Sequence, residues 1–129
     1  MIKVYVKKQS NYPIHAPQIK KHLSSFFANH GLVSDADCSV AIVGKSVMID
    51  LAKKYLGEDN KIHNVLTFNE GDVDRKFVNI EGDLIHLGEI VVCYPQALEE
   101  AKKEGKLIED KVNELIDHGA MHLMGIHHE

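Results

Sequence analysis

The stretch Cys38-Ser39-Val40-Ala41-Ile42-Val43 consists mostly of small and β-branched apolar residues. Continuous runs of this kind are typical of a strand that is covered on both faces, whereas a half-exposed strand alternates apolar and polar residues. Coverage on both faces requires other elements to pack against each side of the sheet. We therefore expect a layered fold in which helices lie against a sheet.

The segments on either side of this strand predict a further strand and two helices. Apolar residues alternate in segment 1–8, as they do in a strand. Segment 17–30 carries an apolar stripe at helical spacing, and Gly31 stops it. A second helix is expected from an N-cap at Ser46 to a stop at Gly57. The inward-facing residues of the two helices are expected to be Ile19, Leu23, Phe26 and Phe27, and Met48, Leu51, Ala52 and Tyr55.

Two more strands are expected in the second half of the chain, at residues 65–68 and 85–93. The polar segment between them has turn signals around Gly71 and Gly82, so we expect a hairpin arm there. Gly88 interrupts the second strand, which indicates a β-bulge or a close approach of another backbone.

Two helices complete the expected fold. The first begins at Pro95 and ends before Gly105, and the last spans about residues 107–124 with His118 and His122 at the border of its apolar stripe. This order of elements predicts an α+β sandwich with a mixed, roughly four-stranded sheet packed against about four to five helices. Residues 1–129 are expected to form a single domain.

The composition is that of an ordinary soluble globular protein, with 44% hydrophobic and 26% charged residues. No apolar run approaches the ~20 residues that a membrane span needs, and the first residues form a strand pattern instead of a signal peptide. We therefore expect a cytoplasmic protein, by default a monomer. Cys38 and Cys93 lie singly in apolar runs, which favours buried, reduced thiols.

The chemistry is expected near the carboxyl end, in the stretch His118-Gly119-Ala120-Met121-His122-Leu123-Met124-Gly125-Ile126-His127-His128. His118 and His122 are four residues apart, so a helix places their imidazoles on one face within reach of a shared metal ion. Gly125 is expected to end the helix, which would let the chain turn back and deliver His127 or His128 as a third ligand. Three imidazoles and an open fourth position describe a catalytic zinc site.

A metallopeptidase shares this histidine spacing but carries a glutamate general base directly after the first histidine. Gly119 occupies that position here, so a peptidase lacks its base. A zinc metallohydrolase or metalloprotease-like enzyme is therefore the third reading of the motif.

The string instead resembles the signature of the YbeY family of rRNA-maturation endoribonucleases, His-Gly-x-Leu-His-Leu-x-Gly-Tyr-Asp-His. Six residues match it, namely His118, Gly119, His122, Leu123, Gly125 and His128. The resemblance extends to segment 51–68, where Asn64, Val65, Leu66 and Phe68 match directly, and to segment 88–92. It implies that His118, His122 and His128 bind one Zn²⁺, with Ni²⁺ or another divalent ion as the alternative.

The resemblance implies a metal-dependent, single-strand-specific endoribonuclease that acts in 16S rRNA processing, with ribosomal RNA and the small ribosomal subunit as partners. His118, His122, Asn64 and His127 are then the candidate catalytic residues. Asn64 either orients the phosphate or packs the strand edge, and His127 stands where the family has Asp and is a candidate hydrogen-bond partner or proton shuttle.

The net charge of −4 counts against a nucleic-acid binder, unless basic side chains gather on one face. The candidate RNA-binding residues are Lys53, Lys54, Arg75 and Lys76. Leu56 stands where the family has a functionally important Arg. Either Leu56 weakens catalysis, which favours a metal-binding ribosome assembly factor with little or no activity, or it simply extends an apolar stripe while Arg75 or a lysine supplies the charge.

Overall fold

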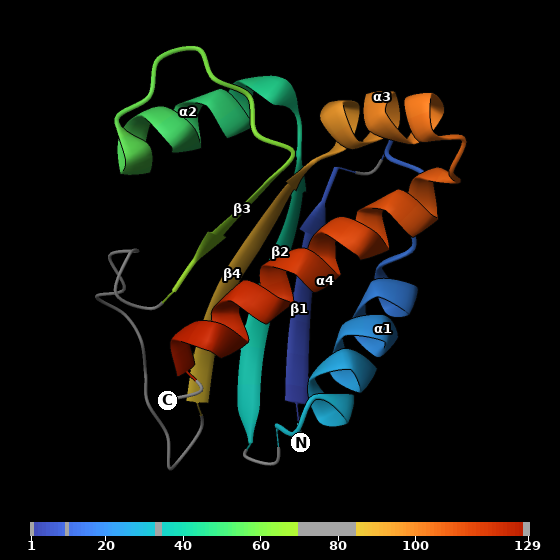
Figure 1. The fold of residues 1–129 in the computed structure, drawn as a ribbon, viewed down its shortest axis with the longest axis vertical. Helices are drawn as coiled ribbons and strands as arrows, with labels where there is room; N and C mark the ends of the chain where they lie inside the picture. Colours follow the sequence, from blue (N-terminus) through green and yellow to red (C-terminus); the bar gives the residue numbers. More distant parts are fainter. Residues whose placement is uncertain (1, 10, 33–34, 70–84, 128–129) are drawn as a thin grey trace.

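The computed structural model describes residues 2–9, 11–32, 35–69 and 85–127, with the backbone alone described at 126 and 127. Its elements, in chain order, are β1 (Ile2–Lys8), α1 (Ala16–Asn29), β2 (Ala36–Val43), α2 (Lys45–Leu56), β3 (Val65–Phe68), β4 (Ile85–Cys93), α3 (Tyr94–Glu104) and α4 (Ile108–His127) (Figure 1). The expected hairpin arm falls within residues 70–84, outside the described residues.

The four strands form one mixed sheet in the order β1-β2-β4-β3. β1, β2 and β4 run parallel, and the short β3 pairs antiparallel with β4 at the edge. This confirms the predicted fold class. The chain crosses from β1 to β2 through α1, as a parallel pair requires.

Helices cover the two faces of the sheet unequally. Ile90 and Val92 of β4 pack into the larger core, which includes α1, α3 and α4, whereas Val91 and Cys93 face α2. Figure 1 shows α1 and α4 side by side across the first face. The expectation that β2 is covered on both faces was only half right. Its residues alternate between buried and partly exposed, because α2 is the one described helix on the second face.

The expected apolar stripes of the helices are buried, with Phe26, Leu51 and Tyr55 only partly so. The helix boundaries lie within about one residue of the sequence-based expectation, except the start of α2 and the end of α4. α2 begins one residue before Ser46 with Gly44 as its N-cap, and no side chain caps it. α4 continues through Gly125 to His127.

Gly88 produces both features that its position in the strand predicted. The register between β2 and β4 shifts there, and the backbone of Gly88 has a φ of +140°. A Cβ atom at this position would lie 2.3 Å from the backbone oxygen of Phe68 and 2.9 Å from Leu123 Cδ2. A side chain is therefore excluded, and the missing Cβ lets β3, β4 and α4 meet closely.

Cys38 and Cys93 are buried and free, as expected. Burial raises the pKa of the Cys38 thiol to about 12, so it stays protonated at neutral pH. Among the described helices, none has the length and apolar character needed to cross a bilayer.

Candidate metal-binding groove

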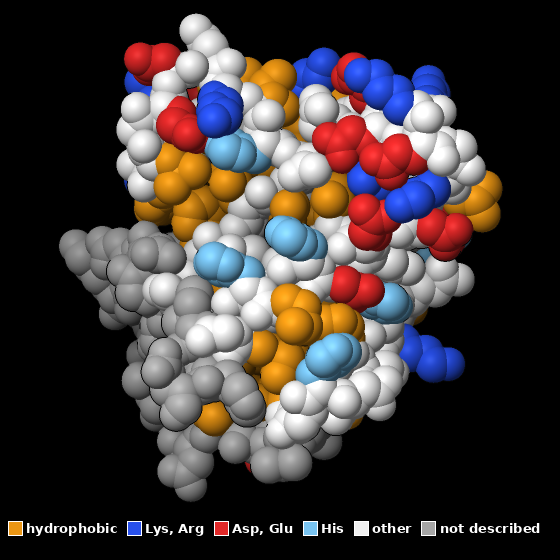
Figure 2. Space-filling view, in the orientation of Figure 1, with side chains coloured by type: hydrophobic (Ala, Val, Ile, Leu, Met, Phe, Trp, Pro, Cys, Tyr) orange, Lys and Arg blue, Asp and Glu red, His pale blue; other side chains and the backbone are white. Residues whose placement is uncertain are grey.

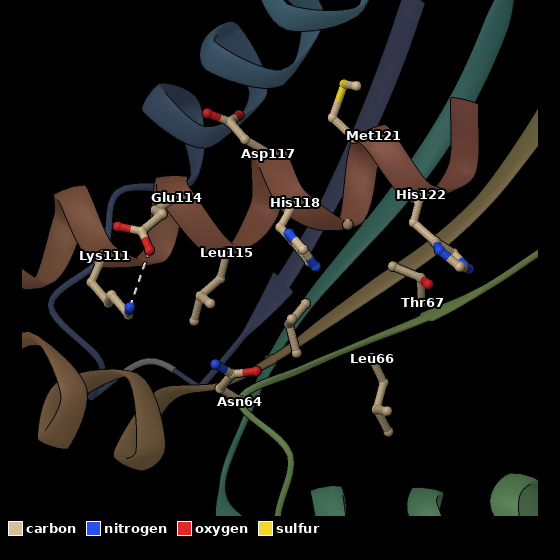
Figure 3. A pocket seen from close by; sticks show the side chains of 12 residues that line it. Asn64, Leu66, Thr67, Lys111, Glu114, Leu115, Asp117, His118, Met121 and His122 are labelled. Atoms are coloured by element: carbon tan, nitrogen blue, oxygen red, sulfur yellow. Dashed lines mark hydrogen bonds and ion pairs between the residues drawn. The ribbon is translucent and has the colours of Figure 1, made fainter. Parts of the chain in front are cut away.

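An open groove runs between α4 and β3 and has a volume of about 640 Å³. One wall is the exposed side of α4, and the other is the edge strand with the residue before it. Its lining residues are Asn64, Val65, Leu66, Thr67, Lys111, Glu114, Leu115, Asp117, His118, Gly119, Met121 and His122 (Figure 3). The groove therefore joins Asn64 to the histidine pair, although more than fifty residues separate them in the sequence.

His118 and His122 lie one turn apart on α4 and both line the groove. Leu115, Ile116 and Leu123 anchor the buried side of the same helix. The expected border position of the two histidines is confirmed, because both side chains are exposed while their helix is packed against the sheet. Within the described part of the chain, no hydrogen bond or ion pair engages either imidazole. Their nitrogen lone pairs are thus available to a ligand.

The expectation that Gly125 ends the helix is wrong. α4 continues to His127, and Gly125 is not among the glycines with a positive φ. Three histidines therefore do not meet in the described residues, which contain no group of three potential metal ligands. His128 lies outside the described residues, and only the backbone of His127 is described.

Gly119 lies at a close contact between α4 and the sheet. A Cβ atom there would lie 2.9 Å from Thr67 Cγ2 and 3.0 Å from Ile90 Cγ2. The larger side chain of a glutamate would require the side chains of Thr67 and Ile90 to move. Packing thus gives a physical reason why this helix cannot carry the general base of a metallopeptidase, and it agrees with the rejection of that reading.

A network of ion pairs and hydrogen bonds holds Asn64 at one end of the groove. Its amide nitrogen donates to Glu100 Oε1 over 3.1 Å, and Gln96 donates to the other carboxylate oxygen over 3.2 Å. The ammonium group of Lys111 lies 3.5 Å from Glu100 Oε1 and also binds Glu104 and Glu114, at 3.0 and 3.1 Å. Lys111 is only 4% exposed, so its charge is compensated inside the protein.

The pKa values in this network follow from the mutual stabilisation of its charges. Burial would raise the pKa of the Glu100 carboxyl, but hydrogen bonds from Asn64 and Gln96 and the charge of Lys111 outweigh burial and lower it. Burial would likewise lower the pKa of Lys111, but hydrogen bonds to Glu104 and Glu114 raise it. The network is therefore ionised at neutral pH.

The two candidate RNA-binding residues that the structure describes, Lys53 and Lys54, do not line the groove. Lys53 and Lys54 are exposed in the last turn of α2, on the opposite face of the sheet from α4. Leu56 ends the same helix and is 49% exposed, so it does not extend the buried stripe of Met48 and Ala52. Arg75 and Lys76 lie outside the described residues.

Sequence reasoning missed Thr67, Lys111, Glu114, Asp117 and Glu100 as parts of the site. The residues of α4 carried a usable signal, because Lys111, Leu115, His118 and His122 follow each other at spacings of three or four and share one helix face. Glu100 carried no such signal, since it comes from another helix and contacts the groove residues Asn64 and Lys111.

Comparisons with known proteins agree with this architecture. A family model described as Endoribonuclease YbeY matches residues 5–129. A protein named Endoribonuclease YbeY from Albidiferax ferrireducens is 30% identical over 122 residues, which cover 95% of this chain and 75% of the relative. One of the same name from Azoarcus sp. is 34% identical over 110 residues, covering 85% of this chain. The aligned part is 42% of that relative, so this chain matches less than half of its length.

A solved structure supports the fold independently. The solution structure of TM1509 from Thermotoga maritima superposes with a TM-score of 0.62 at 24% identity. The match covers 95% of this chain and 71% of that one.

Proposed function

The chain belongs to the YbeY family of endoribonucleases, and we propose that it is a metal-dependent endoribonuclease that hydrolyses phosphodiester bonds of single-stranded RNA. The observation that carries this proposal is the pair His118 and His122, which lie one turn apart on the wall of an open groove and whose imidazoles have no partner among the described residues.

We propose that His118, His122 and His128 hold one divalent ion, Zn²⁺ or alternatively Ni²⁺. The fit rests on the donor set, because two imidazoles at helical spacing line the same groove and have no competing partner among the described residues. A bound ion would act as a Lewis acid on a phosphoryl oxygen and would lower the pKa of a water nucleophile to about 7.

The protein's own side chains then bind and orient the RNA. Glu100 can only accept hydrogen bonds when ionised, so it fixes the Asn64 amide with its nitrogen toward Glu100. The carbonyl oxygen of Asn64 is left for the groove, as Figure 3 shows. In this position Asn64 can accept a hydrogen bond from a ribose hydroxyl or a water molecule next to the scissile phosphate. His127 remains a candidate proton shuttle.

The proposed substrate is ribosomal RNA of the small subunit, and the proposed setting is 16S rRNA maturation in the cytoplasm. These finer statements come from the family resemblance, and the fold supplies no independent argument for them.

The test combines metal analysis with RNA cleavage. Protein purified without chelators is expected to hold about one divalent ion per chain and to cleave single-stranded ribosomal RNA. His122→Ala should lose both properties. His15→Ala is the matched control, because His15 is also an exposed histidine at a helix end and lies outside the groove. Full metal occupancy in His122→Ala would contradict the proposed site.

One observation favours a second candidate function, a metal-binding ribosome assembly factor with little or no catalysis. The family's Arg position holds Leu56, and the groove contains Glu114 and Asp117, whose charges oppose phosphate binding. Metal-dependent binding of small-subunit RNA without cleavage would favour this function over the first.

A further inference from the structure

The groove between α4 and β3 does not supply a free positive charge within its described lining. Lys111 is the lysine in that lining, and three carboxylates surround its ammonium group. An RNA chain is a polyanion whose binding depends largely on neutralising its phosphates. If the proposed function holds, cationic groups next to this groove must bind the RNA on either side of the cleaved bond.

A second groove of about 460 Å³ lies on the α1 side of α4. Its lining consists of Gln18, Lys21, His22, Ser25, Phe26 and Asn29 of α1, the C-cap residue His30, and Asn113 of α4. Among the described residues, no carboxylate belongs to this lining. Amides, a hydroxyl, imidazoles and an ammonium group are the side chains that contact phosphates, sugars and base edges in protein complexes with nucleic acids.

α1 is cationic in an acidic protein. Its fourteen residues are all described, and they include Lys20 and Lys21 but no Asp or Glu, although the chain carries 19 acidic residues and a net charge of −4. Figure 2 shows acidic side chains, interspersed with basic ones, gathered where α3 meets the start of α4. The charge of this helix thus complements a phosphate backbone.

The second groove also offers a flat surface for a base. The rings of Phe26 and His30 are stacked, with centroids 4.0 Å apart and planes inclined by 23°. A 2.8 Å hydrogen bond between His30 Nδ1 and the Phe26 carbonyl holds the imidazole in place, while the side chain stays exposed. Single-stranded nucleic acids commonly bind by stacking bases on aromatic rings of this kind next to basic side chains.

One pair of residues connects the two grooves. His22 lines the second groove and Asp117 the first, and His22 Nε2 lies 2.6 Å from Asp117 Oδ1. The contact positions α1 against α4 and gives the Asp117 carboxylate a partner, which reduces its repulsion of a phosphate passing between the grooves.

We infer that the α1 groove binds the continuation of the single-stranded RNA whose scissile phosphate lies at His118 and His122; this rests on the proposed function. Lys21 contacts a phosphate, and the Phe26–His30 pair stacks one base. The amides of Gln18, Asn29 and Asn113 bind sugar or base edges without demanding one sequence.

The test measures equilibrium binding of a fluorescein-labelled oligouridylate by anisotropy, with metal-free protein so that cleavage does not interfere. Lys21→Ala should weaken binding about three- to tenfold at low salt and reduce the slope of log affinity against log salt by about 0.7. His30→Ala should weaken binding about fivefold or more through lost stacking. Lys20→Ala is the matched control, because Lys20 is the neighbouring exposed lysine of α1 and does not line the groove.

Equal losses of affinity in Lys20→Ala and Lys21→Ala would show that only net charge matters and would overturn the inference. Wild-type affinity in both Lys21→Ala and His30→Ala would also overturn it, and so would the absence of binding by the wild-type protein. A parallel cleavage assay with metal-loaded protein tests the proposed function separately. Binding that depends on Lys21 without any cleavage would overturn the enzymatic function alone. If the wild-type protein cleaves RNA but Lys21→Ala and His30→Ala bind it with wild-type affinity, only the inference about the α1 groove is overturned.

Discussion

The side chains of Asn64 and Glu100 are 36 positions apart in the sequence and are joined by a 3.1 Å hydrogen bond from the amide nitrogen to Oε1. A carboxylate cannot donate, so this bond sets which end of the amide faces the groove. Glu100 is itself held by Gln96 and Lys111. Asn64 is therefore oriented from α3 and α4, and not by its own strand.

Replacing Glu100 should impair Asn64 without removing metal. Glu100→Ala frees the Asn64 amide, and we expect kcat for RNA cleavage to fall about fivefold, the equivalent of one hydrogen bond of ~1 kcal/mol. Glu100→Gln keeps an acceptor oxygen and should restore most of the rate. Glu99→Ala is the control, since Glu99 is an exposed residue of the same helix that pairs with Lys103 at 3.7 Å. Equal rates in Glu99→Ala and Glu100→Ala would show that Asn64 needs no such support.

The two glycines of α4 should respond oppositely to alanine. Gly119→Ala places a methyl group against Thr67 and Ile90, and we expect a loss of about 1–3 kcal/mol in the free energy of unfolding. Gly125→Ala meets open space in a helical backbone, so stability should stay equal or rise by up to about 1 kcal/mol. Urea denaturation of the metal-free proteins measures both. A stable Gly119→Ala would mean that α4 does not press against the sheet as described.

Of the two adjacent histidines, His128 should be the ligand. Each residue of an α-helix advances by about 100°, so His127, nine positions after His118, lies on the opposite side of a continuous α4. Metal titration of His127→Ala and His128→Ala should therefore give the larger affinity loss in His128→Ala. The reverse order would place His127 in the coordination sphere and require α4 to unwind before it.

Leu56→Arg should raise ribonuclease activity without changing metal content. Leu56 is 49% exposed, so the substitution should alter the free energy of unfolding by no more than about 0.5 kcal/mol. A guanidinium there can bind a phosphate through two hydrogen bonds and stabilise transition-state charge. Cleavage rates of wild type, Leu56→Arg and Arg75→Ala at matched metal occupancy decide the matter. If Leu56→Arg is inert and Arg75→Ala inactive, the role belongs to Arg75.

The ion pairs of Lys111 with Glu100, Glu104 and Glu114 should make the free energy of unfolding depend on pH in the acidic range. The pKa values of Glu100 and Glu114 are lowered from 4.5, so their contribution is full above about pH 4.5 and is lost as the pH falls through their folded-state values. Lys111→Met leaves carboxylates without their buried cation and should cost about 3 kcal/mol at pH 7. This deficit should shrink as the pH falls toward 4. Lys103→Met is the control, because it removes an exposed surface ion pair, and it should show neither effect on the free energy of unfolding in urea titrations across this pH range.

The sequence by itself determined most of the elements of this fold. Alternation predicted β1, glycine and proline positions predicted the ends of α2 and α3, and Gly88 predicted its bulge, because each signal depends on residues close in the chain. The pairing of His118 with His122 was predictable for the same reason, since one helical turn separates them. Local signals failed at Ser46 and Gly125, where more than one backbone conformation was possible for the same residues.

Tertiary structure alone decided what surrounds the histidines. The contact of Gly119 with Thr67 and Ile90 places α4 beside β3 and so creates the groove. Glu100 meets Asn64 across 36 positions, and His22 meets Asp117 across 95. Such partners leave no periodic trace in the sequence, because the packing of whole helices against the sheet brings them together. The kind of metal-binding side chain is thus determined by the sequence of one helix, whereas the orientation of Asn64 and the proposed path of the RNA depend on the assembled sheet and helices.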